Sequence, residues 1–402
     1  MGNNDKNYKL EALSWVDKLS NEILYISEYL YMNPELGSEE YKACSLLTEI
    51  LAKHGFKIEK ELLGMKTAFK ASFTGLSEKT KIAFLAEYDA LPGIGHGCGH
   101  NVIAATAVGA AIAISKVLPE IEGEIMVIGT PAEEGNGPYA GSKIIMVERG
   151  VFKDIDAVLM MHPTTGRYAA TRTEALAVQG FKVVFRGRTA HAAANPEMGI
   201  NALNAVMIMF RGIDALRQHI RRDARIHGII VKGGEASNVI PDYAEARIGI
   251  RAADINYLNI LKEKVFNCIK GAAIMTEAKY EIEEVGPLYR EKKIYHKLAD
   301  IVDKNLEEHG FKVMPMEEYL RRGPVASTDF GNVTQVVPAI SASIPITDQI
   351  IPGHSREFAE ATMTEEGKKR TILSTKVLVG SAMDLFLNKN LLEEVKGEFR
   401  GN

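Results

Sequence analysis

Three short apolar runs, each followed by polar residues, constrain the fold of this 402-residue chain more than any other feature. The runs occupy residues 81–89, 123–131 and 156–163, and helical patterns lie between them at 102–116 and near 141–149. Apolar runs of this length predict strands, and their alternation with helices predicts a mostly parallel sheet covered by helices. We therefore predict an α/β domain.

Two helices are predicted ahead of the first strand. Apolar residues spaced by about 3.6 positions predict a helix from Tyr8 to Tyr31. A second helix is expected to open at Ser38 and to end at Gly55, because glycine commonly follows the last turn of a helix.

The pattern changes near residue 176. From there to residue 289 the sequence predicts a strand, a helix, two strands, a helix and a strand, which is the order of the ferredoxin-like α+β plan. We interpret this segment as a domain inserted into the first one. The predicted α/β domain therefore comprises 1–175 and 290–402, and the predicted inserted domain comprises 176–289.

Composition and charge narrow the possible functions. The 48 basic and 52 acidic side chains give a net charge of −4, and no long basic run indicates a nucleic-acid partner. The apolar run Val102–Ile114 is shorter than the ~20 residues that span a bilayer, and the polar N-terminus lacks a signal-peptide pattern. Three scattered cysteines make no disulfide framework. We expect a cytoplasmic protein that binds small molecules or a second copy of itself, with no nucleic acid and no membrane.

The densest chemical signal is the pair Cys98 and His100, on the glycine-rich turn after the first strand. A thiolate and an imidazole two residues apart can bind one metal ion, because Gly99 lets the backbone fold close to it. Taken alone, such a pair is more often a buried thiol beside a loop histidine. The neighbouring His96 is expected to be solvated or to play a supporting role.

Two adjacent carboxylates, Glu133 and Glu134, follow the second strand. Neighbouring side chains at a strand exit point in different directions, so one carboxylate can bind a metal ion while the other holds a proton from a water. An isolated pair of this kind usually belongs to a solvated loop. Here the apolar strand before the pair is expected to carry it to the same crevice as Cys98 and His100.

Two further histidines are candidates. His162 ends the third strand, and His354 lies far down the chain in the segment IPGHSREF. A histidine at a strand end is often an ordinary core residue. In combination, however, the candidates supply five nitrogen, sulfur or oxygen ligands, which is enough for two metal ions. The five candidates are Cys98, His100, Glu134, His162 and His354.

Seven separated motifs stand out along the chain: AEYDALPGIGHGCGHN, GTPAEEGNGP, MMHP, GRTAHAAANPEMGINALNA, GGEASNVIPDYAEARIGIR, STDFGNV and PGHSREF. With these motifs the sequence resembles the M20 metallopeptidase and amidohydrolase family. It most resembles the branch that contains p-aminobenzoyl-glutamate hydrolase and the aminoacylase-like Xaa-Arg and β-alanyl-lysine dipeptidases. The resemblance runs in order from about residue 10 to residue 388.

The resemblance implies a di-metal catalytic domain interrupted by a lid that forms a homodimer. It makes the five candidates the ligands of two divalent ions, zinc or manganese, with Glu133 as the general base on a bridging water and Asp89 as the residue that orients a ligand. It implies that His191 of the lid stabilises the oxyanion in the partner subunit's site. Asn238 and Arg251 are implied to hold the free carboxylate of the substrate. Without the resemblance, His191 and Arg251 would be interpreted as surface residues.

Two departures from the family pattern limit what the resemblance implies. Many relatives have a His-x-Asp motif whose histidine binds metal, whereas this chain has Glu87-Tyr88-Asp89, which leaves open whether Glu87 is a ligand. The loop after Glu134, GNGPYAGSK, also lacks the continuous glycine run of this branch, which leaves the shape of the site wall open there.

The predicted function is metal-dependent hydrolysis of the amide bond between an acyl or aminoacyl group and an amino acid with a free carboxylate. Two alternatives stay open. One is an ordinary dipeptidase or tripeptidase, and the other is a binding protein that has kept the metal site without turnover. The motifs of serine hydrolases, phosphate-binding loops and dinucleotide-binding folds are absent from the sequence.

Overall fold

The computed structural model describes residues 3–322 and 326–401, which form two compact units. Unit 1 consists of the described residues of Met1–Glu174, Lys293–Gly323 and Asn332–Asn402. Unit 2 consists of the described residues of Ala175–Lys292 and Pro324–Gly331. Each unit has its own sheet and its own apolar core.

The described residues of Pro324–Gly331 belong to unit 2, although the sequence analysis expects them in the α/β domain. The reason is a backbone pairing with the start of the insertion. The Leu176 N–H donates to the Ala326 carbonyl at 2.9 Å, and the Ser327 hydroxyl donates to the Leu176 carbonyl at 2.8 Å.

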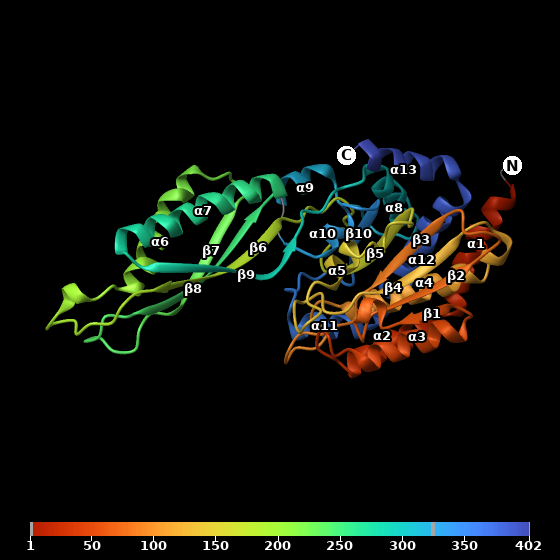
Figure 1. Cartoon of the computed structure of the whole chain (residues 1–402). Helices are drawn as coiled ribbons and strands as arrows, with labels where there is room; N and C mark the ends of the chain where they lie inside the picture. The colour runs from red at the N-terminus through yellow and green to blue at the C-terminus, as the bar shows by residue number, and fades with distance from the viewer. Residues whose placement is uncertain (1–2, 323–325, 402) are drawn as a thin grey trace. The chain divides into compact units, whose positions relative to one another are not determined.

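Six strands of unit 1 form one sheet: β1 (Lys57–Lys60), β2 (Phe69–Thr74), β3 (Lys81–Ala86), β4 (Glu124–Gly129), β5 (Ala157–Thr164) and β10 (Ala339–Pro345). Their order is β1-β2-β4-β3-β5-β10 (Figure 1). The pairs β3/β4, β3/β5 and β5/β10 are parallel, whereas β1/β2 and β2/β4 are antiparallel. The predicted mostly parallel sheet is therefore confirmed.

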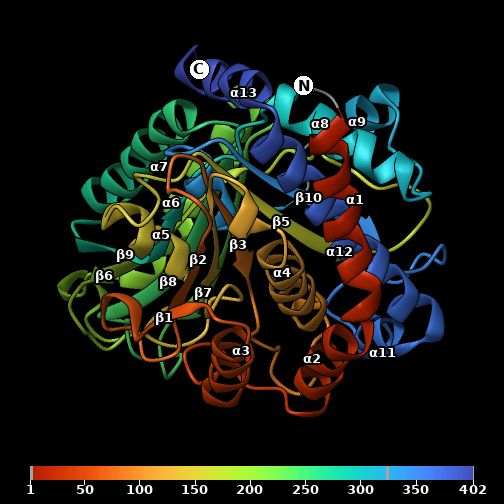
Figure 2. The same ribbon diagram turned by 90° about the vertical axis from the view of Figure 1, so that its right-hand side faces the viewer.

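Helices cover this sheet. Those that belong wholly to unit 1 are α1 (Asn3–Lys18), α2 (Ser20–Met32), α3 (Tyr41–Lys53), α4 (His100–Ser115), α5 (Ser142–Glu148), α8 (His296–Glu308), α9 (Met316–Arg322), α11 (Arg356–Met363), α12 (Glu365–Leu387) and α13 (Lys389–Gly401). The short helix α10 (Phe330–Val333) spans the change from unit 2 to unit 1. In Figure 2, α1, α2 and α12 lie beside α4, in agreement with their contacts.

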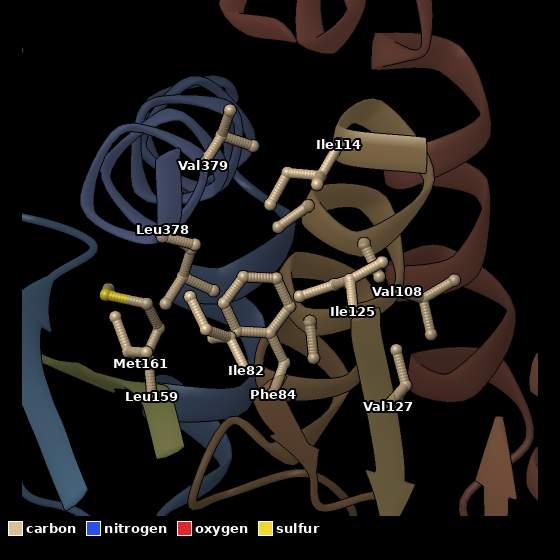
Figure 3. Packing of buried hydrophobic residues seen from close by; sticks show 14 of the residues in the cluster. Ile82, Phe84, Val108, Ile114, Ile125, Val127, Leu159, Met161, Leu378 and Val379 are labelled. Atoms are coloured by element: carbon tan, nitrogen blue, oxygen red, sulfur yellow. The ribbon is translucent and has the colours of Figure 1, made fainter. Parts of the chain in front are cut away.

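The core of unit 1 fills the space between the parallel strands and two helices. Alternate side chains of β3, β4 and β5 pack against α4 and α12, because successive residues of a strand point to opposite faces of the sheet. The intervening residues Leu85, Met126 and Val158 are buried as well, as expected for parallel strands covered on both faces. Figure 3 shows part of this packing, with Ile82, Phe84, Val108, Ile114, Ile125, Val127, Leu159, Met161, Leu378 and Val379 labelled.

Helix α4 is buried along its whole length, as its apolar and small residues predict. At Gly109 this helix lies close to α2, because a Cβ at this position would lie 2.5 Å from Cγ1 of Ile23 in α2. The small residue therefore lets α2 and α4 pack closely. His100 is the first residue of this fully covered helix.

The first two helices differ in detail from the prediction. The expected helix Tyr8–Tyr31 is divided at Leu19 into α1 and α2, although backbone hydrogen bonds continue on both sides of Leu19. Helix α3 begins at Tyr41 rather than at Ser38, because Ser38 has a left-handed backbone with φ of 72°.

Unit 2 contains β6 (Ala177–Arg186), α6 (Ala202–Leu216), β7 (Arg225–Lys232), β8 (Tyr243–Ala252), α7 (Ile255–Thr276) and β9 (Lys279–Tyr289). The strands form an antiparallel sheet in the order β7-β8-β6-β9, and α6 and α7 pack on it around a separate core. This is the predicted ferredoxin-like arrangement.

None of the helices in the described ranges is long and apolar enough to cross a membrane.

Candidate metal centre

The carboxyl ends of three parallel strands lie at one edge of the unit 1 sheet. Asp89 follows β3, the pair Glu133 and Glu134 follows β4, and His162 lies near the end of β5. Polar residues that follow neighbouring parallel strands meet at one place, which is where ligands bind in sheets of this kind.

The turn that carries Cys98 and His100 packs directly on the end of β5. Gly99 between them has a φ of 77°, and a Cβ on it would lie 2.3 Å from Cγ of Pro163. Only glycine fits this close approach and this backbone conformation. The glycine thus brings Cys98 and His100 next to His162.

Hydrogen bonds at Nδ1 orient the rings of the buried His100 and the half-buried His162. The Nδ1–H of His100 donates to Oδ1 of Asp89 at 2.9 Å, and the Nδ1–H of His162 donates to the carbonyl of Pro163 at 2.9 Å. Each ring therefore presents Nε2 to the site, as histidines that bind metal do. Nε2 of His162 lies 3.6 Å from Sγ of Cys98.

The pKa values around these rings favour a cation in the site. Burial lowers the pKa of His100, but the carboxylate of Asp89 outweighs burial and holds that pKa well above its ordinary value. Burial raises the pKa of the Cys98 thiol to about 12. A thiolate at this position therefore requires a positive charge such as a metal ion beside it.

The adjacent carboxylates of the loop after β4 face different partners. The backbone N–H of Glu134 donates to Oδ2 of Asp89 at 2.9 Å, and Oε2 of Glu134 lies 3.7 Å from Nε2 of His354. Oε2 of Glu133 lies 4.0 Å from Nε2 of His100. The two carboxylates are thus directed at different histidines of one cluster.

His354 reaches the cluster from a loop before α11. Its backbone N–H donates to the carbonyl of Gly97 at 2.9 Å, and its φ is 58°. Its side chain is 59% exposed, whereas His100 is fully buried. His96 is buried, so the prediction that it is solvated is wrong, and burial lowers its pKa to about 3. Its supporting role stays a prediction.

The five candidate ligands form overlapping sets whose ligand atoms lie within 4.8 Å of one another. Nε2 of His100 and Oε1 of Glu134 are buried and have no hydrogen-bond partner among the described residues. Buried polar atoms without a partner are costly, so these atoms and the mixed nitrogen, sulfur and oxygen donor set fit divalent metal ions. The sets are Cys98 with His100 and His162, Cys98 with Glu134 and His354, and His100 with Glu133 and Glu134.

A buried ion pair beside this cluster was missed in the sequence. Nζ of Lys143 in α5 lies 2.8 Å from Oε1 of Glu87, and both side chains are at most 1% exposed. Burial raises the pKa of Glu87, but Lys143, His100 and His162 outweigh it and lower that pKa. Glu87 directs its other oxygen, Oε2, to within 3.5 Å of Nε2 of His100. The one sequence signal was Glu87 itself, since a carboxylate in a buried strand end needs a cation.

The three predicted lid residues lie in unit 2, at two different ends of its sheet. His191 pairs with Val239, so His191 and Asn238 lie on adjacent exposed segments beyond the start of β8. Arg251 lies at the other end of β8 and donates to the Ser327 hydroxyl at 3.0 Å. The nine residues from Tyr243 to Arg251 are separated by eight steps along the strand, which together span roughly 26 Å. Asn238 and Arg251 of one chain therefore lie toward opposite ends of β8.

Comparison with protein families gives one match that covers most of the chain. Residues 83–368 match the model of "Peptidase family M20/M25/M40". The matched stretch includes every candidate residue of the metal centre and of unit 2.

Similar proteins extend over nearly the whole chain. The mouse Xaa-Arg dipeptidase is 32% identical over 98% of this chain and 92% of its own length. A p-aminobenzoyl-glutamate hydrolase polypeptide from Escherichia coli K12 is 30% identical over 93% of this chain and 91% of its own length. Among solved structures, the Bacillus subtilis YXEP protein, a dinuclear metal-binding M20 peptidase, has a TM-score of 0.71 at 18% identity and covers 92% of this chain and 99% of its own.

The ligand assignment is tested by metal content. Metal-loaded protein should contain about two divalent ions per chain, and Cys98→Ala should lower both metal occupancy and activity, because its Sγ belongs to two of the ligand sets. Cys44→Ala, which removes a buried thiol in the core of unit 1, is the matched control and should keep its metal. Elemental analysis after gel filtration measures occupancy. A fully loaded and active Cys98→Ala protein would contradict the assignment.

The Lys143–Glu87 pair is tested by unfolding of the metal-free protein in urea. Lys143→Met removes the ammonium group that pairs with the buried Glu87 carboxylate. The variant should therefore lower the free energy of unfolding by ~3–5 kcal/mol. The double variant Lys143→Met/Glu87→Gln should recover part of this loss, because it removes the negative charge of Glu87 together with the positive charge of Lys143. Lys79→Met, which breaks an exposed pair with Glu122, is the control and should change little. Equal effects at Lys143 and Lys79 would show that the buried pair has no special role.

Proposed function

The chain belongs to the peptidase family M20/M25/M40, and from this we propose that it hydrolyses the amide bond between an acyl or aminoacyl group and an amino acid with a free carboxylate. Dinuclear metal binding is typical of M20 enzymes such as the YXEP protein. The proposed cofactor is two divalent ions, held by Cys98, His100, Glu134, His162 and His354.

The position of Glu133 is the observation that carries this proposal. Its carboxylate borders the ligand cluster, 4.0 Å from Nε2 of His100, and its side chain is 14% exposed, twice the 7% of Glu134. A general base needs access to water as well as to the reacting centre. We therefore assign Glu134 to metal binding and Glu133 to proton transfer.

The donor set supports either zinc or manganese. A cysteine ligand favours zinc, whereas carboxylates and imidazoles also suit manganese. When bound, the ions would polarise the scissile carbonyl and lower the pKa of a water from ~16 towards ~7.

The proton path follows from the side chains of this chain. Glu133 accepts a proton from the water whose oxygen attacks the carbonyl carbon, and it returns that proton to the amine nitrogen as the C–N bond breaks. Asp89 keeps the ring of His100 in place through the hydrogen bond at Nδ1. Nδ1 of His191 accepts from the N–H groups of Ala193 and Ala194, so the ring proton is on Nε2, where it can be donated to an oxyanion.

The substrate class rests on the relatives and on the lid. Both curated relatives are named for amides of an amino acid, arginine in one and glutamate in the other. A guanidinium such as that of Arg251 binds a carboxylate through two parallel hydrogen bonds, and Asn238 adds an amide donor. We propose an N-acyl amino acid or a dipeptide as the substrate.

The edge strand of unit 2 supports a homodimer. β7 is one of the two outer strands of its sheet, and Ile229, Ile230 and Val231 on it are between 45% and 62% exposed. An apolar edge strand of this kind tends to pair with another chain. A dimer would also let Asn238 and Arg251 of different subunits serve one site. The free thiols of all three cysteines support a location in the reducing cytoplasm.

The proposed reaction is tested by a hydrolysis screen with zinc and with manganese. N-acyl amino acids, p-aminobenzoyl-glutamate and dipeptides ending in Glu, Lys or Arg are incubated with the metal-loaded protein, and the released amino acid is quantified. Release from at least one amide is expected. Release from ordinary peptides alone would favour a general peptidase, and metal-loaded protein that releases nothing would favour a binding protein.

The Glu133→Gln variant separates proton transfer from metal binding. Glutamine keeps the size of the side chain but does not accept the proton, so kcat should fall by at least ~10²-fold while both metals stay bound. Glu134→Gln is the matched comparison at the neighbouring position, and it should lose metal as well as activity. Turnover rates and elemental analysis are measured on the same samples. Normal turnover in Glu133→Gln with retained metal would exclude Glu133 as the base.

Mixing two inactive variants tests whether subunits share their sites. If His191 acts in the partner's site, a mixed dimer of His191→Ala and Glu133→Gln chains has one site with both defects and one with neither. Mixing should then restore up to about half of the wild-type activity per heterodimer, since independent sites contribute additively. Subunit exchange is verified with two affinity tags. No recovery despite proven exchange would mean that His191 acts within its own chain or not at all.

A further inference from the structure

The loop that carries Glu133 and Glu134 begins in an unfavourable backbone conformation. Ala132 is fully buried and has a φ of 58°, in the left-handed region that residues with a Cβ rarely adopt. Such a conformation persists only where the surroundings hold it. We call the residues Ala132–Tyr139 the base loop.

A short segment ahead of α3 holds the base loop. The buried carboxylate of Glu40 accepts a hydrogen bond at Oε1 from the Ala132 N–H at 2.8 Å. The Ser38 hydroxyl donates to the Asn136 carbonyl at 3.1 Å and accepts from the Tyr139 N–H at 3.0 Å. We call the residues Gly37–Glu40 the clamp.

The clamp and the base loop also approach each other too closely for larger residues. A Cβ on Gly37 would lie 2.9 Å from the Asn136 carbonyl oxygen and 3.0 Å from Cα of Ala132. The left-handed backbone of Ser38, which delays the start of α3, directs its hydroxyl to the base loop. The clamp thus contacts the base loop at Ala132, Asn136 and Tyr139.

The second oxygen of Glu40 connects the clamp, through Thr67, to Tyr88 in the segment after β3. Oε2 accepts from the Thr67 hydroxyl at 2.8 Å, and the Tyr88 hydroxyl donates to the Thr67 carbonyl. Tyr88 lies between Glu87 and Asp89 in the chain. Glu40 therefore links the base loop to the segment after β3. Its side-chain hydrogen bonds among the described residues go to Ala132 and Thr67, and not to a candidate ligand or to Glu133.

We propose that Glu40, with Ser38, is a positioning residue that fixes the backbone at Ala132 and so sets the directions of the Glu133 and Glu134 side chains. A change in the backbone angles of Ala132 changes the directions of both side chains that follow it. Loss of the Glu40 contact therefore displaces the proposed base Glu133 and the proposed metal ligand Glu134 together. This inference rests on the proposed function for its effect on turnover, and on the geometry alone for its effect on metal binding.

Glutamine at position 40 is the conservative replacement. Its carbonyl oxygen can accept from the Ala132 N–H while its amide donates to the Thr67 hydroxyl, so both contacts survive. Burial raises the pKa of Glu40 to about 7, so loss of the negative charge is a small change at this position. Alanine at position 40 removes both contacts.

The experiment compares Glu40→Ala, Glu40→Gln and Ser38→Ala with Leu47→Ala. Leu47 is fully buried in α3 and belongs to the core of unit 1, so its truncation lowers stability without a contact to the base loop. For each variant, thermal unfolding, affinity for zinc or manganese in the metal-depleted protein, and kcat and KM are measured on an amide that the wild type hydrolyses.

Glu40→Ala should lower kcat by ~10²-fold, as expected for a misplaced catalytic group, and weaken metal affinity by ~10-fold or more. Glu40→Gln should retain most of the kcat and most of the metal affinity, and Ser38→Ala should have values between those of Glu40→Ala and Glu40→Gln. Leu47→Ala should lose stability while its kcat and metal affinity stay near those of the wild type. If Glu40→Ala does not fold, the comparison of kcat and metal affinity is made between Ser38→Ala and Leu47→Ala.

The proposal is overturned if Glu40→Ala and Leu47→Ala differ only in stability, or if Glu40→Gln is as impaired as Glu40→Ala. A wild type that binds metal but hydrolyses no amide would refute the proposed function. In that case the role of the clamp is tested by the metal titration alone, in which Glu40→Ala must bind zinc or manganese more weakly than Leu47→Ala does.

Discussion

The carboxylate of Asp89 is the contact on which the rest of the metal centre depends. One oxygen accepts from the ring of His100, and the other accepts from the backbone N–H of Glu134. These two hydrogen bonds join the end of β3, the first turn of α4 and the loop after β4. Burial raises the pKa of Asp89, but His100, the Glu134 N–H and Lys143 outweigh burial and lower it, so the group is held as an anion. A fixed buried anion orients one ligand and the loop of another at the same time.

The fold and the ligand cluster were largely predictable from the sequence because both follow from local patterns. Apolar runs with polar ends predict strands whose carboxyl ends meet, and this alone places Asp89, Glu134 and His162 together. The five candidate ligands could be proposed from the sequence because each is a residue type that binds metals and stands next to a strand or a glycine.

The supporting contacts were not predictable, since they join positions that no local pattern connects. Lys143 looks like an ordinary residue in the first turn of a helix, and Glu40 looks like a solvated acid before one. Glu40 and Ala132 are 92 residues apart in the chain. Only the packing of α3 beside the sheet makes them neighbours. The same holds for Ser38, whose left-handed backbone no periodicity indicates.

The insertion of unit 2 has a consequence for biosynthesis. β10 completes the sheet beside β5, and α12 covers α4, but both are encoded after the insertion. While the chain emerges from the ribosome, the apolar faces of β5 and α4 stay uncovered during the whole synthesis of unit 2. Exposed apolar surface of this kind promotes aggregation of the nascent chain. Synthesis of the catalytic unit, unit 1, thus begins before that of unit 2, but unit 1 can complete its fold only after unit 2 has been synthesised.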